Sequence, residues 1–292
     1  MNFDVVIVGA GIVGAACARR LAADGLRVAV AEERAVATGT TAAGMGHLVV
    51  MDDSEAQFAL TEYSRRLWNE LAPSLPETNE YEFCGTIWVA ADGEEMDEVA
   101  RKHQYYAERG VRSEILDERS LREAEPNLRE GLAGGLLVKD DSVVYQIGAA
   151  KFLLDEAVSN GTVMFAGSRV AALDEAGAVL ADGTQIEAAL VLNAAGTGAS
   201  GLTPGLPIRK KKGHLVITER YPGFVSHQLV ELGYIKSAHA SEADSVAFNV
   251  QPRETGQVLL GSSRQYDRDD AGIDLVDAGE PEETLERRRG IG

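Results

Sequence analysis

The sequence has little of several features that would mark a specialised class of protein. It has two cysteines, Cys17 and Cys84, in 292 residues, and they fit neither a metal site nor a disulfide framework. No apolar run approaches the ~18 residues that a membrane-spanning helix needs. No basic leader precedes the first apolar run, so we expect no signal peptide. Unpaired thiols without an export signal predict a cytoplasmic protein.

Positive charge is also scarce. The 28 Lys and Arg residues face 46 Asp and Glu residues, which gives a formal net charge of -18. The negative electrostatic field of such a surface repels nucleic-acid phosphates and anionic lipid, so neither is an expected partner. The four-charge run 209–212 is interpreted as a solvated strand edge. With 45% hydrophobic and 25% charged residues, the chain can form a packed core of one or two domains.

The chain begins with a complete βαβ pattern. A β-branched run at 5–8 leads directly into Gly9, Gly11 and Gly14, which form GxGxxG, and an Ala-rich helical stretch then precedes a second apolar run at 28–31. The first glycine permits a tight turn, the second lets the backbone approach a pyrophosphate, and the third allows close helix–strand packing. The helix start, with Ile12 and Val13, turns its amide groups toward the anion. The pattern therefore predicts a dinucleotide site.

An acidic residue ends the second predicted strand. Glu32 is placed to accept hydrogen bonds from an adenosine ribose, although Glu33 could exchange roles with it, and Arg34 completes this segment. An acid here fits NAD or FAD and disfavours NADP. An NAD-dependent dehydrogenase would continue with further alternating strands and helices, whereas this chain continues with a loop of small residues. The loop therefore favours FAD.

The stretch VVIVGAGIVGAACARRLAADGLRVAVAEER, followed by TTAAGMG, resembles the FAD-dependent D-amino-acid oxidase (DAO) family, especially its glycine-oxidase and sarcosine-oxidase-like branch. The resemblance implies FAD as cofactor and a loop whose main chain passes along the pyrophosphate and the flavin ring. The loop residues are Thr40, Thr41, Ala42, Ala43, Gly44, Met45 and Gly46. It also implies that the Val170 backbone meets adenine and that Ala195 and Gly196 pack against the dinucleotide. A flexible glycine-rich loop is the alternative for 40–46.

The predicted fold class is α/β. A Rossmann-like FAD-binding domain, 1–46 and 146–207, is interleaved with an α+β substrate domain, 47–145 and 208–265, built on a mainly antiparallel sheet. Residues 266–292 are expected to form an acidic tail. The family normally continues into a C-terminal segment with a substrate-binding arginine and a glycine-rich helix start, and no such motif is present here. The resemblance thus implies a shortened chain with weak or absent FAD retention.

Two local patterns predict detail in the substrate domain. Ser54 and Gln57 form a capping box before a helix whose apolar positions we expect in the core. Those positions are Leu60, Tyr63, Leu67 and Leu71. The stretch QPRETGQ predicts a hairpin turn between two strands.

The resemblance implies hydride transfer from the C–N bond of a small D-amino or imino acid to flavin N5, after which the imine hydrolyses. The candidate catalytic residues are His47, Tyr145, Asn249 and Arg264, because a substrate carboxylate is normally held by an Arg or a Tyr hydroxyl. No metal is expected. The segments TTAAGMGHLVVMDD, FNVQPR and GSSRQ resemble D-hydroxyproline and other D-amino-acid dehydrogenases. An electron acceptor or a partner subunit is a further expected partner.

Two other functions stay open. The first is a noncatalytic or incomplete FAD-binding chain that needs a partner or a missing C-terminus before it can react. The second is an NAD-dependent dehydrogenase, which the loop after Glu32 disfavours.

Overall fold

The structure is a computed structural model that describes residues 2–233, 245–266, 268, 270 and 272. The chain forms two compact units, each built from three stretches. Unit 1 contains Met1–Gly46, Leu75–Asn79 and Tyr145–Ile208, and unit 2 contains His47–Ser74, Glu80–Val144 and Arg209–Gly292. The short stretch Leu75–Asn79 therefore lies in unit 1, inside a region that the sequence analysis assigned to the other domain.

Unit 1 contains a six-stranded sheet in the order β8-β2-β1-β11-β10-β9. Its strands are β1 (Phe3–Val8), β2 (Val28–Glu32), β8 (Val163–Ala166), β9 (Val170–Asp174), β10 (Gly177–Leu180) and β11 (Gln185–Asn193). The four strands from β8 to β11 in this order are parallel, and β10 and β9 continue as antiparallel neighbours. β1 is buried almost throughout, as its β-branched run predicts.

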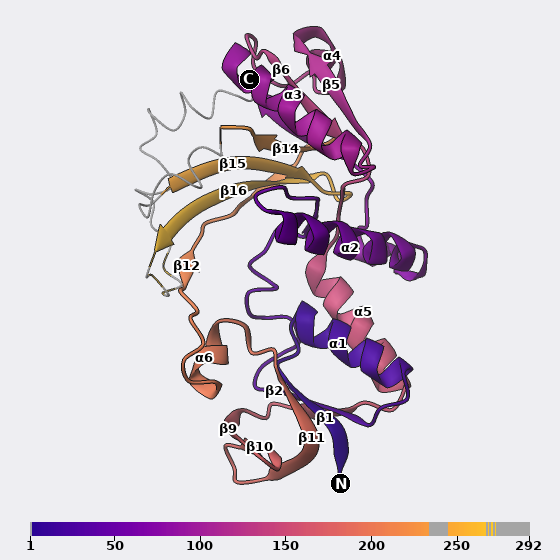
Figure 1. Ribbon diagram of the computed structural model, residues 1–292, viewed down its shortest axis with the longest axis vertical. Coiled ribbons are helices and arrows are strands. Elements are labelled where there is room, and N and C mark those ends of the chain that lie inside the picture. Colours follow the sequence, from indigo (N-terminus) through magenta and orange to yellow (C-terminus); the bar gives the residue numbers. More distant parts are fainter. Residues whose placement is uncertain (1, 234–244, 267, 269, 271, 273–292) are drawn as a thin grey trace. The chain divides into compact units, whose positions relative to one another are not determined.

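The helices of unit 1 pack through small residues. They are α1 (Ile12–Ala23), α5 (Gln146–Ser159) and α6 (Ala199–Leu202), with the 3₁₀ turns η2 (Glu77–Asn79) and η3 (Gly196–Gly198). α1 and α5 lie side by side (Figure 1). Their buried positions are mainly Ala, including Ala15, Ala18, Ala149 and Ala150, and small side chains let helix axes approach closely.

Unit 2 is built on an eight-stranded sheet in the order β12-β16-β15-β14-β4-β6-β5, with β13 also paired to β16. The strands are β4 (Thr86–Ala90), β5 (Ser113–Asp117), β6 (Gly134–Val138), β12 (Lys211–Lys212), β13 (Val216–Arg220), β14 (Gln228–Glu231), β15 (Ser245–Pro252) and β16 (Gln257–Tyr266). All neighbours are antiparallel except β14 and β4. The predicted hairpin turn between β15 and β16 is confirmed, because the Arg253 amide donates to the Gln257 carbonyl at 3.0 Å.

A small second sheet in unit 2 pairs β3 (His47–Leu48) with β7 (Ser142–Val143) in antiparallel fashion. The helices of this unit are α2 (Glu55–Leu71), α3 (Gly93–Glu108) and α4 (Glu118–Ala124), with the 3₁₀ turn η1 (Ala72–Ser74). Each of the three α-helices begins after a polar cap, Ser54, Asp92 or Asp117, whose side chain accepts from a backbone amide in the first turn.

The predicted core face of α2 is wrong. Leu60, Tyr63 and Leu67 are exposed by 67%, 51% and 45%, and α2 instead buries Phe58 and Arg65. The apolar spacing does describe one stripe of the helix, but tertiary contacts decide which stripe is covered. Arg65 faces inward because it forms an ion pair with the buried Asp141.

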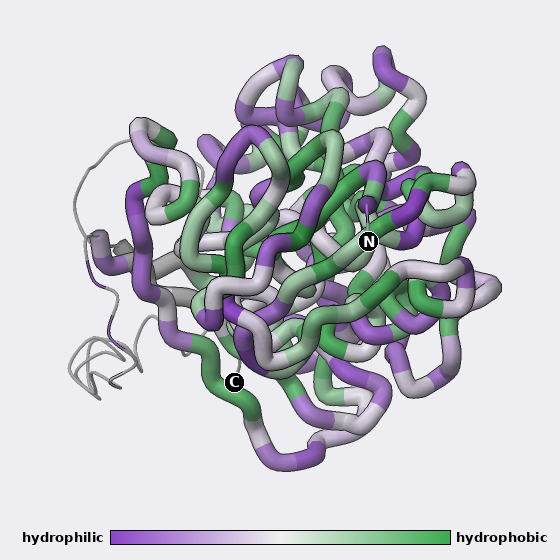
Figure 2. Tube along the Cα trace, turned by 90° about the horizontal axis from the view of Figure 1, so that it is seen from below, coloured by the Kyte–Doolittle hydropathy of each residue, from purple (hydrophilic) through white to green (hydrophobic). Residues whose placement is uncertain are grey.

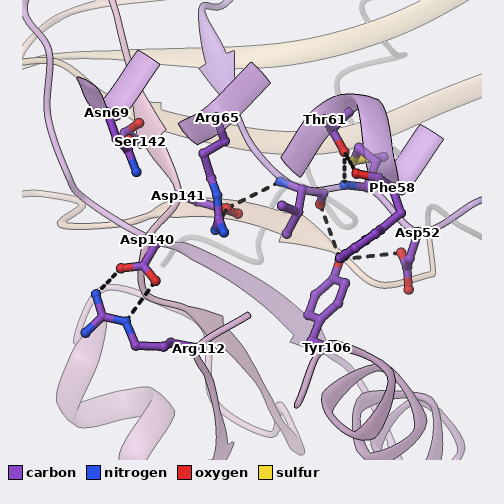
Figure 3. A network of polar contacts seen from close by, with 12 residues as sticks. Asp52, Phe58, Thr61, Arg65, Asn69, Tyr106, Arg112, Asp140, Asp141 and Ser142 are labelled. Atoms are coloured by element: carbon purple, nitrogen blue, oxygen red, sulfur yellow. Dashed lines mark hydrogen bonds and ion pairs between the residues drawn. The ribbon is translucent and has the colours of Figure 1, made fainter. Parts of the chain in front are cut away.

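Buried charge is a feature of the core of unit 2, where Figure 3 shows Arg65 beside Asp141. Lys102 is fully buried, forms an ion pair with Asp52, and lies 4.3 Å from the Trp88 ring and 5.0 Å from the Tyr106 ring. The Tyr106 hydroxyl donates to the Val50 carbonyl at 3.2 Å. Burial lowers the pKa of Lys102, whereas Asp52 acts in the opposite direction. The buried charge of Lys102 is therefore stabilised only while Asp52 is present beside it.

Hydrophobic and hydrophilic residues are interspersed along the chain (Figure 2). Within the described residues, no helix is long and apolar enough to cross a membrane. The same part of the chain contains no group of three or more His, Cys, Asp or Glu side chains arranged to hold a metal ion.

Replacing Lys102 with Met is expected to lower the free energy of unfolding by about 3 kcal/mol, because the Asp52 carboxylate would lose its cationic partner in the core. Equilibrium denaturation in urea measures this loss. Arg101→Met is the matched control, since the Arg101 ion pair with Glu98 is exposed and such pairs contribute about 0–1 kcal/mol. Equal losses in the two variants would contradict the prediction.

Candidate functional site

The GxGxxG turn of unit 1 brings strand β1 against the start of helix α1. Gly9 has a φ of +101°, a conformation that favours glycine, and a Cβ there would lie 2.6 Å from the Ala194 carbonyl oxygen. A Cβ on Gly14 would lie 2.0 Å from the Gly9 carbonyl oxygen. Two of the three glycines are thus required by direct backbone contact.

The start of α1 is suited to hold an anion. Gly11 is its N-cap and provides no side-chain hydrogen bond, and the first turn has no acidic residue. The Ile12 amide donates to the Thr41 hydroxyl at 3.0 Å, and the Val13 side chain is 62% exposed. An uncapped helix start with an accessible first turn attracts phosphate through its amide groups and its dipole.

The end of β2 places a carboxylate beside this turn. One Glu32 oxygen accepts from the Ala10 amide at 2.7 Å, and the other accepts from the Arg34 amide at 2.8 Å. Glu33 is exposed and its carboxylate lies 3.5 Å from the Arg34 guanidinium. The Ser168 amide donates to the Glu32 carbonyl at 2.8 Å, which brings the segment before Val170 to the end of β2.

The loop of small residues is folded into consecutive turns. The amides of Ala42, Ala43 and Gly44 donate to the carbonyls three residues earlier, at 3.0 to 3.3 Å. Thr40, Ala42 and Ala43 are exposed, whereas Met45 is buried. Gly46 has a φ of +86° where the chain passes into β3. The loop thus has an ordered backbone and exposes small side chains.

The turn after β11 completes the arrangement. The Ala194 amide donates to the Val8 carbonyl at 2.9 Å, and the Ala195 amide donates to the Asn193 side chain at 3.3 Å. A Cβ on Gly196 would lie 3.8 Å from the Thr40 hydroxyl. Three segments far apart in sequence, the GxGxxG turn, the 40–46 loop and the 193–196 turn, therefore meet in unit 1.

This arrangement fits the adenosine diphosphate part of FAD. It combines glycines that a Cβ would disrupt, a helix start whose N-cap residue has no side chain and a carboxylate at the end of β2. The predicted cofactor residues lie on these three segments or at the end of β2, apart from Val170, which starts β9 beyond Ser168.

The candidate catalytic residues divide between the two units. Tyr145 is the N-cap of α5 in unit 1, and its amide donates to the Asn79 carbonyl at 2.7 Å. His47 in β3 and Asn249 in β15 belong to unit 2. Arg264 lies in β16 opposite Ser245, but its side chain is outside the described part of the structure. Of the four candidates, His47 and Asn249 are therefore the two that belong to the same unit and have side chains that the structure describes.

His47 lies in a dry environment. Burial lowers the pKa of its imidazole to about 4, and the Gln251 side chain acts in the opposite direction. Its Nε2 atom is buried without a hydrogen-bond partner among the described residues. The imidazole is therefore neutral at pH 7 and suited to hydrogen bonding rather than to holding a proton.

Two side chains, one in each unit, were not predicted from the sequence. Gln146, the first residue of α5, donates from its side chain to the Gly44 carbonyl at 2.5 Å and so fixes the small-residue loop. Gln251 is the side chain that faces His47. The sequence could have indicated Gln146 only through its position at the start of a predicted helix. No local pattern in the sequence indicated a role for Gln251.

Known proteins match this chain in sequence and in fold. A family model described as FAD dependent oxidoreductase (DAO) matches residues 4–289. The hydrogen cyanide synthase subunit HcnC of Pseudomonas aeruginosa is 27% identical, over 94% of this chain and 74% of HcnC. Glycine oxidase of Geobacillus kaustophilus is 30% identical over 56% of this chain, and the match spans only 46% of that enzyme.

The crystal structure of Geobacillus kaustophilus glycine oxidase gives a TM-score of 0.83 at 24% identity, and covers 99% of this chain and 78% of that chain. At this identity the match shows the fold. The predicted mixed α/β class is therefore confirmed.

Replacing Gly14 with Ala is expected to weaken FAD binding at least tenfold and to destabilise the protein by about 1–3 kcal/mol, since the methyl group would force β1 and α1 apart. Fluorescence titration with FAD and thermal unfolding measure the two effects. Gly201→Ala, in the same unit, is the control, because a Cβ there meets nothing within 4 Å. Normal FAD affinity in the Gly14 variant would contradict the role of this contact.

The His47 imidazole is expected to stay neutral from pH 8 to pH 5. In the unfolded chain it takes up a proton near its ordinary pKa of 6.5, but in the folded chain only near 4. The stability contributed by neutral His47 is therefore present above pH 6.5 and is lost as the pH falls toward 4. NMR titration of the ring protons, assigned with the His47→Gln variant, measures the pKa, and a folded value near 6.5 would refute the prediction.

Proposed function

The chain belongs to the DAO family of FAD-dependent oxidoreductases, whose cofactor is FAD, and from this premise we propose that it oxidises the C–N bond of a small amino or imino acid. The family resemblance seen in the sequence is thereby confirmed. The observation that carries the proposal is the meeting of the GxGxxG turn, the 40–46 loop and the 193–196 turn in unit 1. The match to glycine oxidase supports an amino-acid substrate.

Unit 1 is proposed as the FAD-binding domain. The amides at the start of α1 would hold the diphosphate, and Glu32 would accept hydrogen bonds from the ribose. The Thr41 hydroxyl fixes the loop to α1 through the Ile12 amide, and Gln146 holds the loop at Gly44. These contacts stabilise a backbone that bulky side chains would keep away from the cofactor.

Unit 2 is proposed as the substrate domain. Bound FAD supplies an acceptor for the hydride that leaves the carbon of the C–N bond. The protein must then orient a neutral amine. Because the pKa of His47 is about 4, its imidazole cannot take the proton from a substrate ammonium at pH 7 and instead offers a neutral hydrogen-bonding nitrogen. Asn249 offers a second neutral polar group in this unit.

The proposed substrate is a D-amino or imino acid with a small side chain, and the imine product hydrolyses in water. Anaerobic mixing of the FAD-reconstituted chain with D-proline, D-hydroxyproline, D-alanine or glycine is expected to bleach the flavin absorption near 450 nm. Their L-enantiomers, where they exist, are the matched controls. Bleaching by a 2-hydroxy acid but by none of the amines would overturn the proposed bond class.

A second candidate function is an FAD-binding chain that reacts only with a partner or with further polypeptide. Two observations favour it: the match to glycine oxidase spans 46% of that enzyme, and HcnC is named as a subunit. In the same experiment this candidate predicts a chain that binds FAD and is bleached by none of the compounds. NAD binding without FAD binding would refute both functions.

A further inference from the structure

The eight-stranded sheet of unit 2 has two different faces. One face is apolar, because Ile87, Leu229 and Val250 from three neighbouring strands lie in one core cluster with the residues of α4 and β16. On the other face, Trp88 of β4 and Val230 of β14 lie in the cluster that also contains Phe58 and Tyr106. Since side chains alternate along a strand, Gln228, Asn249 and Gln251 share this second face.

The three amide side chains are close neighbours on that face. Val230 pairs with Asn249 and Leu229 pairs with Val250, and one step further along this antiparallel register places Gln228 opposite Gln251. Directly opposed residues have Cβ atoms about 5 Å apart. Asn249 and Gln251 are two positions apart on β15, so the three side chains form one group.

Each of the three side chains has an unused acceptor. The carbonyl oxygens of Gln228, Asn249 and Gln251 are buried and have no hydrogen-bond partner among the described residues. The exposed fractions are 1% for Gln228 and 3% for Gln251. A buried polar atom without a partner is costly, and the large majority of such atoms in folded proteins are satisfied. Packing alone does not explain three such atoms in one group, since apolar residues of similar volume would avoid the cost.

The group continues to His47. Gln251 faces the imidazole, whose Nε2 atom also lacks a partner among the described residues. His47 and Asn249 are partly exposed as whole residues, whereas the His47 Nε2 atom and the Asn249 side-chain oxygen are buried. None of the four side chains carries a charge at pH 7. Uncharged acceptor oxygens attract N–H and O–H donors and repel a carboxylate.

We infer that Gln228, Asn249 and Gln251 form a subsite that accepts hydrogen bonds from the amine or hydroxyl group of a small substrate. This inference rests on the proposed function and adds to it the substrate's orientation. The amine end lies against the face of unit 2 that carries the three oxygens, and the carboxylate lies elsewhere. Gln228 and Gln251 thereby become residues that determine specificity.

The test uses three compounds of one shape that cannot be oxidised, because they have no α-hydrogen. In 2-aminoisobutyrate, 2-hydroxyisobutyrate and pivalate, the same position carries an amino group, a hydroxyl group or a methyl group. Calorimetric titration of the FAD-reconstituted full chain gives the dissociation constants. The amino compound is expected to bind at least about tenfold more tightly than pivalate, with the hydroxy compound between them.

The variants Gln228→Met and Gln251→Met remove an acceptor but keep the side-chain length. Each is expected to reduce the preference for the amino compound to about two- to threefold. Gln104→Met is the matched control, because Gln104 is exposed on α3 and donates to Glu108. A preference that is absent in the wild type, or that survives in both variants, would overturn the inference.

Thermal unfolding of the ligand-free chain separates a binding role from a structural one. If the three oxygens serve to bind a ligand, the Met variants keep or raise the melting temperature, since the substitution removes an unsatisfied buried group. If the side chains hold the sheet together, the melting temperature falls by several degrees, and that result counts against the inference. Because these compounds do not react, failure of the bleaching experiment would reject the proposed function without deciding this subsite.

Discussion

The contact between Gly9 and Gly14 is the constraint on which the rest of unit 1 depends. A helix start can approach the preceding turn this closely only where no side chain intervenes, and a Cβ on Gly14 would lie 2.0 Å from the Gly9 carbonyl oxygen. The same turn accommodates the Ala194 carbonyl on its other side. Because the turn is so compact, the amides at the start of α1, the carboxylate of Glu32 and the loop anchored by Thr41 come to one place.

Unit 2 follows a different principle. Its core contains charges that are tolerated only in pairs, Lys102 with Asp52 and Arg65 with Asp141. Figure 3 shows Arg65 beside Asp141. Burial raises the pKa of Asp141 to about 7, while Arg65 opposes that shift. Asp141 immediately precedes β7, which pairs with the strand that carries His47. A network of buried polar groups therefore supports the strand that presents the dry imidazole, and uncharged acceptors occupy the neighbouring sheet face.

Local patterns predicted much of unit 1 because the relevant atoms are close in sequence. The glycine spacing, the helix after it and the acid at the end of β2 all fall within the first 32 residues. The helix α2 shows the limit of such patterns. Its apolar spacing identified a stripe at Leu60, Tyr63 and Leu67, yet the opposite side became buried, because Arg65 meets a carboxylate 76 positions later. Periodicity gives the geometry of a helix but not the direction of its neighbours.

The sequence by itself determined the βαβ unit and its glycine-rich turn, because backbone sterics and short-range hydrogen bonds require those residues at those positions. The resemblance of the same stretch indicated the family. The tertiary structure alone decided that Gln146 holds the Gly44 carbonyl and that Gln251 faces His47. Strand register and helix docking join residues that are tens to hundreds of positions apart. Such contacts follow from the packing of whole elements, and no local pattern in the chain encodes them.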